Sequence, residues 1–110
     1  NMNELEKLRV EIDKLDKQLL PLFLERMELC GKVADYKREV GMPVLDAVRE
    51  AQVLENKMSL LQDDSMRDEV YEFFNSIMTI SRVRQNKILF DTEERVHSSD
   101  MIKKSVKFAV

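Results

Sequence analysis

The sequence predicts an all-α protein of three helices, of which the first is unusually long. With 110 residues, the chain is long enough for one small domain with a single core. It has only two Gly and two Pro, and 35% of its residues are charged, which is typical of helices with well-solvated outer faces. Apolar residues recur at the three- and four-residue spacing of one helix face in three separate stretches. Each stretch therefore predicts one amphipathic helix.

The first predicted helix runs from Leu5 to Val40. Its apolar stripe consists of Leu5, Leu8, Ile12, Leu15, Leu19, Leu22, Leu29, Val33 and Tyr36. Pro21 removes one backbone hydrogen bond and bends a helix locally, but the register passes through it without a phase slip, so one helix is expected. At about 1.5 Å per residue the helix spans roughly 54 Å, whereas a compact chain of this size has a radius of gyration of about 13 Å. We therefore expect a second copy of the chain to cover the stripe.

Two further helices follow a short connector. Gly41 and Pro43 end the first helix. Asp46 is a typical N-cap and predicts a second helix from Ala47 to Gln62. After a polar break, a third helix is predicted from Met66 to Phe90. Its apolar stripe consists of Val70, Phe73, Phe74, Ile77, Ile80, Val83 and Ile88.

The last twenty residues have a different pattern. Residues 91–100 are polar and charged without a clean period, which predicts a linker. Residues 105–110 alternate like the beginning of a strand. The predicted division is a helical domain at 4–90, followed at 91–110 by a linker and the possible start of a second domain. A frayed tail is the open alternative.

Composition narrows the class of protein. The net charge of −3 gives no general attraction to nucleic acid or acidic membranes. The single cysteine, Cys30, cannot form an intramolecular disulfide and fits a reducing compartment. No run approaches the roughly 20 apolar residues of a membrane span, and the N-terminus does not resemble a secretory signal. We expect a cytoplasmic protein without nucleic-acid or membrane partners.

Polar residues interrupt the apolar stripes of two helices. Arg26 stands where the first stripe requires another leucine, and a buried cation is costly unless an anion meets it. Lys37 lies 11 residues later on nearly the same face, about 16 Å along the axis, so the two can reach opposite ends of one small anion. Ser81 and Gln85 are i,i+4 neighbours beside the apolar face of the third helix. Together these side chains predict an anion site.

The second helix and the start of the first add to this pattern. Asp46, Arg49 and Glu50 cluster in the first turn of the second helix, where acidic residues suit the helix dipole and an arginine does not. Arg9 lies 17 residues before Arg26, about 25 Å away along the helix, so one small ligand cannot touch both in one chain. In an antiparallel pair of first helices, Arg9 of one copy can approach Arg26 of the other.

Ordinary structural roles are the alternatives. Arg26 could pair with Glu25, Glu28 or an acid on another helix, and Lys37 could extend to solvent. Ser81 could donate to the carbonyl one turn earlier in its helix. Arg49 and its neighbour could form a surface ion pair. The chain would then be a helical dimerisation or regulatory module.

Five segments resemble the all-helical chorismate mutases, and the similarity covers about residues 4–90. They are Leu8–Asp16, Leu19–Met27, Val33–Lys37, Gly41–Glu50 and Ser81–Gln85. The resemblance implies an intertwined homodimer of three-helix chains that rearranges chorismate to prephenate, on the route to phenylalanine and tyrosine. This unimolecular reaction needs no cofactor, metal, nucleophile or proton transfer. Accordingly, we find no convincing nucleophile–base pair, and His97 lies in the predicted linker.

The resemblance also assigns roles to residues. It implies that Lys37 and Gln85 donate to the ether oxygen of chorismate, where negative charge develops. Arg26 and the partner's Arg9 would hold the two carboxylates, and Ser81 would bind the ring carboxylate. Since the amide of Gln85 does not titrate, we expect a flat rate–pH profile from about pH 5.5 to 8.

The remaining implied roles concern the ring hydroxyl of the substrate. Glu50 would accept a hydrogen bond from it together with the backbone of Asp46. Arg49 would orient both acids and could face a carboxylate. An isochorismate pyruvate-lyase would share the fold and the anion site, so it remains an alternative. Residues 106–110 weakly resemble the start of a prephenate dehydratase, so fusion to such a domain is a further expectation.

Overall fold

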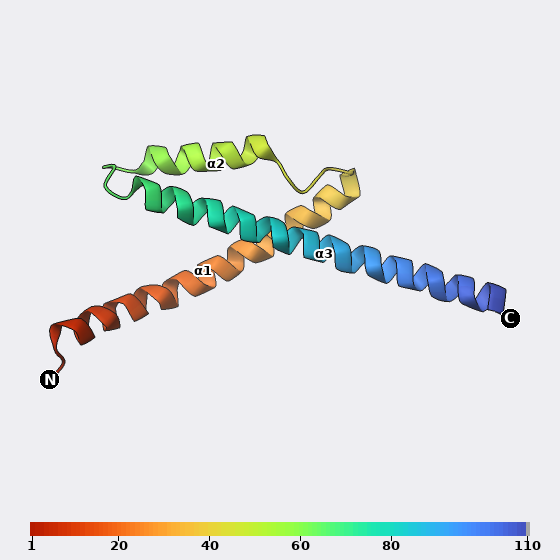
Figure 1. Cartoon of the computed structure of the whole chain (residues 1–110), viewed down its shortest axis with the longest axis horizontal. Coiled ribbons are helices and arrows are strands. Elements are labelled where there is room, and N and C mark those ends of the chain that lie inside the picture. Colours follow the sequence, from red (N-terminus) through yellow and green to blue (C-terminus); the bar gives the residue numbers. More distant parts are fainter. Residues whose placement is uncertain (110) are drawn as a thin grey trace.

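The computed structural model describes the backbone of residues 1–109 and the side chains of residues 1–91. Within that range the chain forms three helices and no strand, in the order α1 (Glu4–Val40), α2 (Ala47–Leu60) and α3 (Arg67–Ala109) (Figure 1). Helix α1 crosses α3, while α2 lies alongside the first part of α3 (Figure 1). The all-α class and the three helices are thus confirmed.

Local signals set both ends of α1. The side chain of Asn3 accepts a hydrogen bond from the backbone N–H of Glu6 at 2.9 Å and caps the first turn. Gly41 ends the helix with φ of +73°, a left-handed conformation that glycine adopts without a steric penalty. Pro21 lies inside the helix, as predicted. One continuous helix therefore carries Arg26 and Lys37.

Small residues on α1 allow close packing where α1 crosses α3. A Cβ atom added to Gly31 would lie 3.2 Å from Cδ1 of Ile88, which is tighter than an ordinary van der Waals contact. Ala34, one turn further along α1, is fully buried. Small residues at these two positions bring the site residues of α1 close to those of α3.

Helix α2 begins where the sequence predicts and ends two residues earlier. The side chain of Asp46 accepts a hydrogen bond from the backbone N–H of Arg49 at 2.9 Å, which confirms the N-cap. Leu61 is extended and ends the helix. In the turn that follows, the hydroxyl and backbone N–H of Ser65 donate to Asp63 and lower the pKa of its carboxyl. This turn leads into α3.

The predicted end of α3 is wrong. The sequence pattern predicts that the helix ends at Phe90 and is followed by a linker and the start of a strand, but α3 continues to Ala109. Residues 91–109 contain neither Gly nor Pro, so nothing in them strongly opposes continuation of the helix. The short alternation at 105–110 is not sufficient to start a strand, and Val110 and the side chain of His97 lie outside the described residues. The division into domains at residue 90 stays a prediction.

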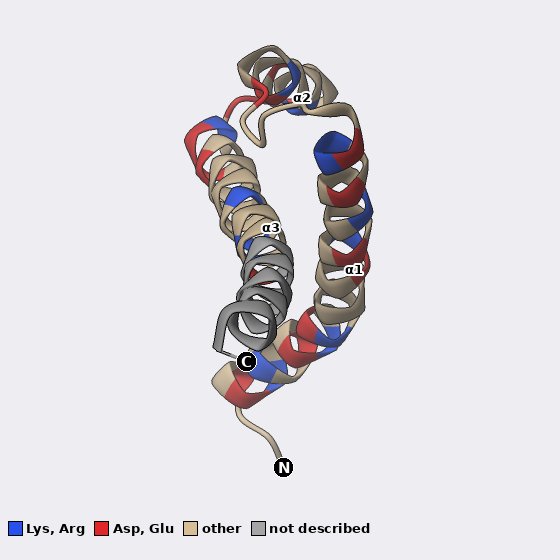
Figure 2. Cartoon of the chain, turned by 90° about the vertical axis from the view of Figure 1, so that its right-hand side faces the viewer, with Lys and Arg blue, Asp and Glu red and all other residues tan. Residues whose placement is uncertain are grey.

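The chain is extended and leaves its long apolar stripe uncovered. Its radius of gyration is 21.0 Å, against about 13 Å for a compact chain of similar length. The nine residues of the α1 stripe are each 45–62% exposed. Acidic and basic residues are mixed along α1 (Figure 2). Exposed apolar surface of this extent marks an interaction face.

In the part of the chain that the structure describes, no helix has the length and apolar character needed to cross a membrane.

Candidate active site

A pocket of about 180 Å³ lies between α1, the connector, α2 and α3. Seven of the eight site residues predicted from the sequence line it: Arg26, Lys37, Asp46, Arg49, Glu50, Ser81 and Gln85. The eighth, Arg9, is exposed on the first part of α1 and does not line the pocket. The fold therefore brings together residues that lie up to 59 positions apart in the sequence.

Arg26 is held by neutral groups. Its Nη1 atom donates to the hydroxyl of Ser81 at 2.8 Å and lies 3.7 Å from Sγ of Cys30. Among the described side chains no carboxylate lies within ion-pair distance of it, so pairing with Glu25 or Glu28 is not found. The half-buried guanidinium is thus positioned without being neutralised.

The hydroxyl of Ser81 both accepts and donates a hydrogen bond within the chain. The oxygen accepts from Arg26, and the single hydrogen is donated to the carbonyl of Ile77 at 2.8 Å. The predicted alternative, donation to the carbonyl one turn earlier, is confirmed. In this structure Ser81 therefore orients Arg26, and its hydrogen would have to turn away from Ile77 to reach a ligand.

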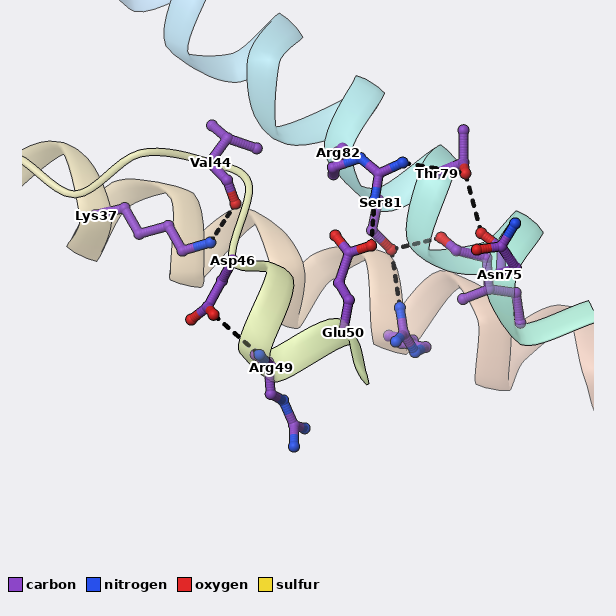
Figure 3. A network of polar contacts seen from close by, with 11 residues as sticks. Lys37, Val44, Asp46, Arg49, Glu50, Asn75, Thr79, Ser81 and Arg82 are labelled. Carbon is purple, nitrogen blue, oxygen red and sulfur yellow. Dashed lines mark hydrogen bonds and ion pairs between the residues drawn. The ribbon is translucent and has the colours of Figure 1, made fainter. Parts of the chain in front are cut away.

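Lys37 is buried, with 8% of its surface exposed, so it does not extend to solvent as the alternative predicted. Its ammonium donates to the carbonyl of Val44 in the connector at 2.6 Å (Figure 3). An ammonium carries three donors, and no described side chain supplies a carboxylate to it. A buried cation without an anion is unfavourable, which makes an anionic ligand the natural partner.

Gln85 supplies a second polar group that lacks a partner. The side chain is 7% exposed, and its Oε1 atom is buried without a hydrogen bond to any described residue. Native proteins rarely leave such an atom unpaired, because the loss is about 1–3 kcal/mol. Since Gln85 also lines the pocket, its amide is available to a polar ligand.

Glu50 is paired across two helices, but not with the residue that the sequence analysis assigned to it. Its carboxylate forms an ion pair with Arg82 on α3, and the guanidinium of Arg82 also donates to the hydroxyl of Thr79 at 3.3 Å (Figure 3). Arg49 points away from Glu50 in Figure 3. The reason is geometric, because adjacent residues lie about 100° apart around a helix and do not face each other. This corrects the predicted pairing of Arg49 with Glu50.

Arg82 was missed by the sequence analysis. It lies between Ser81 and Gln85 and three residues before the latter, a spacing that places two side chains on neighbouring parts of one helix face. This spacing could have identified Arg82 as a residue of the site. Its acidic partner could not be inferred, because Glu50 lies on a different helix.

The balance of charge favours an anion. Four cationic side chains line the pocket, namely Arg26, Lys37, Arg49 and Arg82, against two acidic ones. One of the acids is already paired with Arg82. No cluster of three or more His, Cys, Asp or Glu side chains within the described residues is placed to bind a metal ion. The arrangement suits a small dianion held by directed N–H donors.

Comparison with known proteins agrees with this chemistry. The family model for chorismate mutase type II matches residues 8–86. The chain is 24% identical over 95 residues to the chorismate mutase of Methanocaldococcus jannaschii, covering 86% of this chain and 96% of that protein. It is 30% identical over 92 residues to the T-protein of Haemophilus influenzae, covering 83% of this chain and 24% of that protein.

A further relative is the 4-amino-4-deoxychorismate mutase of Streptomyces venezuelae, which is 35% identical over 65 residues. That match covers 59% of this chain and 55% of the relative. The chain therefore spans about a quarter of the T-protein and nearly all of the archaeal enzyme.

Proposed function

Because the chain belongs to the type II chorismate mutase family, we propose that its pocket converts chorismate to prephenate. One observation carries the proposal. Arg26 and Lys37 line the same pocket, and neither has a carboxylate partner among the described residues. A dicarboxylate that bridges them would supply the missing negative charge, and the NH2 group of Gln85, which lines the same pocket, would donate a hydrogen bond to the substrate.

The reaction needs positioning rather than group transfer. In this Claisen rearrangement a carbon–oxygen bond of the ether breaks while a carbon–carbon bond forms within the same molecule. The protein therefore accelerates it by holding the substrate in its compact conformer and by stabilising the charge that develops on the ether oxygen. Lys37 and Gln85 are the donors proposed for that oxygen. Lys37 is already fixed by Val44, so little reorganisation would accompany the reaction.

The remaining side chains orient the substrate. Arg26, held by Ser81, binds one carboxylate, for which the planar guanidinium is well suited. Glu50 accepts the ring hydroxyl with the oxygen that Arg82 does not use, assisted by the backbone of Asp46. Arg49 adds positive charge at the wall of the pocket.

We propose that the second carboxylate is held by the partner's Arg9 in an intertwined homodimer. Two observations support this: the exposed apolar stripe of α1, and the separation of about 25 Å between Arg9 and Arg26 along α1. We also propose the cytoplasm as the compartment, since the single cysteine, Cys30, fits a reducing environment.

Complementation between two inactive variants tests the dimer. Arg9→Ala and Arg26→Ala chains would each assemble into inactive homodimers. A mixed dimer would contain one intact site, because its functional Arg26 and functional Arg9 come from different chains. Co-expression should therefore restore about a quarter of wild-type activity, if chains pair at random. Failure to regain activity in a verified mixed dimer would refute the crossing arginine.

The activity itself is tested by following the loss of chorismate absorbance with the purified chain and identifying the product. We expect prephenate from chorismate and no pyruvate from isochorismate. Release of pyruvate from isochorismate, without prephenate from chorismate, would instead identify a lyase. A stable oligomer that turns over neither compound would favour the dimerisation module.

A further inference from the structure

The ion pair between Glu50 and Arg82 bridges α2 and α3 at the wall of the pocket. Their side chains are 22% and 31% exposed, so the pair is partly shielded from water. Arg82 is anchored a second time by Thr79. It contacts one oxygen of the carboxylate, and no described residue donates to the other oxygen of Glu50. The pair therefore presents one free acceptor atom with almost no net charge.

A pair of this kind distinguishes neutral donors from cationic ones. A neutral hydroxyl can donate to the free oxygen of Glu50 without meeting an opposing charge. An ammonium group in the same place gains the attraction of the carboxylate but is repelled by the guanidinium of Arg82 close behind it. Without Arg82, Glu50 would be an uncompensated carboxylate and would favour the cation.

We propose that Arg82 determines specificity for a neutral hydroxyl over a cationic amino group on the ring of the substrate. This inference rests on the proposed function, in which Glu50 accepts the ring hydroxyl. The natural probe is 4-amino-4-deoxychorismate, the compound in the name of the Streptomyces venezuelae relative, in which an amino group replaces that hydroxyl. The amine is protonated at neutral pH, so the two compounds differ by one positive charge beside Glu50.

The expected effect follows from Coulomb's law. A unit charge about 5 Å away changes an equilibrium roughly fourfold at the dielectric constant of water and roughly 250-fold at an effective dielectric constant of 20. The pair is partly exposed, so the lower part of that range applies. We expect Arg82→Ala to shift the ratio of kcat/KM for the two compounds about tenfold toward the amino compound.

The shift should reside mainly in KM. The ring hydroxyl does not take part in bond breaking, so its hydrogen bond contributes about equally to the ground state and the transition state. A merely structural role of Arg82 would instead lower kcat/KM for both compounds by the same factor. The ratio of kcat/KM for the two compounds therefore separates the two roles, and a change confined to KM supports the role in specificity.

The experiment measures both compounds with the wild type, Arg82→Ala, Arg82→Lys and Arg84→Ala. Arg82→Lys keeps the charge and should retain most of the preference for chorismate. Arg84 lies on the same helix but does not line the pocket, so Arg84→Ala removes an equal charge as a matched control and should leave the ratio unchanged.

Two results would overturn the proposal. One is an unchanged ratio in Arg82→Ala. The other is an equal shift of the ratio in Arg84→Ala, which would assign it to overall charge. If Arg82→Ala does not fold, Arg82→Gln supplies the neutral variant. A wild type without chorismate turnover would refute the proposed function and the inference with it, whereas an active wild type with an unchanged ratio would refute the inference alone.

Discussion

Replacing Gln85 by glutamate should make the activity depend on acid. Gln85 is buried in the wall of the pocket, and its amide can donate at any pH. A carboxyl of nearly the same shape donates only while it is protonated. Burial raises the pKa of the introduced carboxyl and the nearby Lys37 lowers it, so the two effects together set where the change occurs. Neither effect changes the direction of the pH dependence: the variant loses activity as pH rises.

The size of the loss can be bounded. Above the pKa of the introduced carboxyl, the protonated fraction falls about tenfold for each pH unit. The fall should end near a loss of about 10²–10³ in kcat, which is typical for removal of one electrostatic donor at the reacting atom. The wild type should vary by less than about threefold from pH 5.5 to 8, since the amide of Gln85 does not titrate.

The assay is steady-state turnover of chorismate at half-unit steps of pH, with circular dichroism to confirm that the variant stays folded. Gln85→Met is the matched control, because it removes the donor and adds no titratable group. It should be slow at every pH. A Gln85→Glu variant that is equally active at pH 5 and pH 8 would refute the reasoning, as would a wild type that loses activity steeply above pH 6.

Further substitutions distinguish residues needed for activity from residues needed for the stability of the fold. Arg26→Ala should lower kcat/KM by about 10²–10³ and leave the thermal midpoint and the oligomeric state nearly unchanged, because Arg26 has no carboxylate partner in the described chain. A lower thermal midpoint with activity retained would point to a structural role. Gly31→Val should destabilise the fold by about 1–3 kcal/mol in urea unfolding, because the added atoms overpack the crossing with Ile88. In Gly31→Ala the better helix propensity, worth about 1 kcal/mol, offsets a milder contact, so equal midpoints for the two variants would contradict this account.

Helix boundaries were predictable where a local residue imposes them. Gly41 supplies the left-handed conformation that ends α1, and Asp46 supplies the side-chain oxygen that begins α2. The end of α3 was not predictable in this way, because no such residue follows Phe90. A polar segment without Gly or Pro is compatible with a linker and with a helix, and local pattern does not decide between them.

The site was predictable where the spacing of residues along one helix places them on the same face. Arg26 and Lys37 share a face of α1, and Ser81 and Gln85 share a face of α3, so the meeting of these two faces was the only further assumption. Ion pairs between residues on different helices could not be predicted from this spacing. The pairing of Glu50 with Arg82 depends on how α2 lies against α3, which no spacing within one helix encodes.

The exposed stripe of α1 and two pocket cations without a carboxylate partner in the described chain, Arg26 and Lys37, lie on the same helix. Under the proposed dimer, one partner copy covers the leucines and contributes Arg9 to the site, so folding and catalysis share an interface. The effects of a substitution on dimer association and on turnover can still be distinguished. A polar substitution at Leu15 should loosen the dimer and lower activity together, because it withdraws the partner's Arg9 along with the apolar contact. Arg26 bonds to neutral groups of its own chain, Ser81 and Cys30, so its loss should affect turnover and leave the association of the two chains intact.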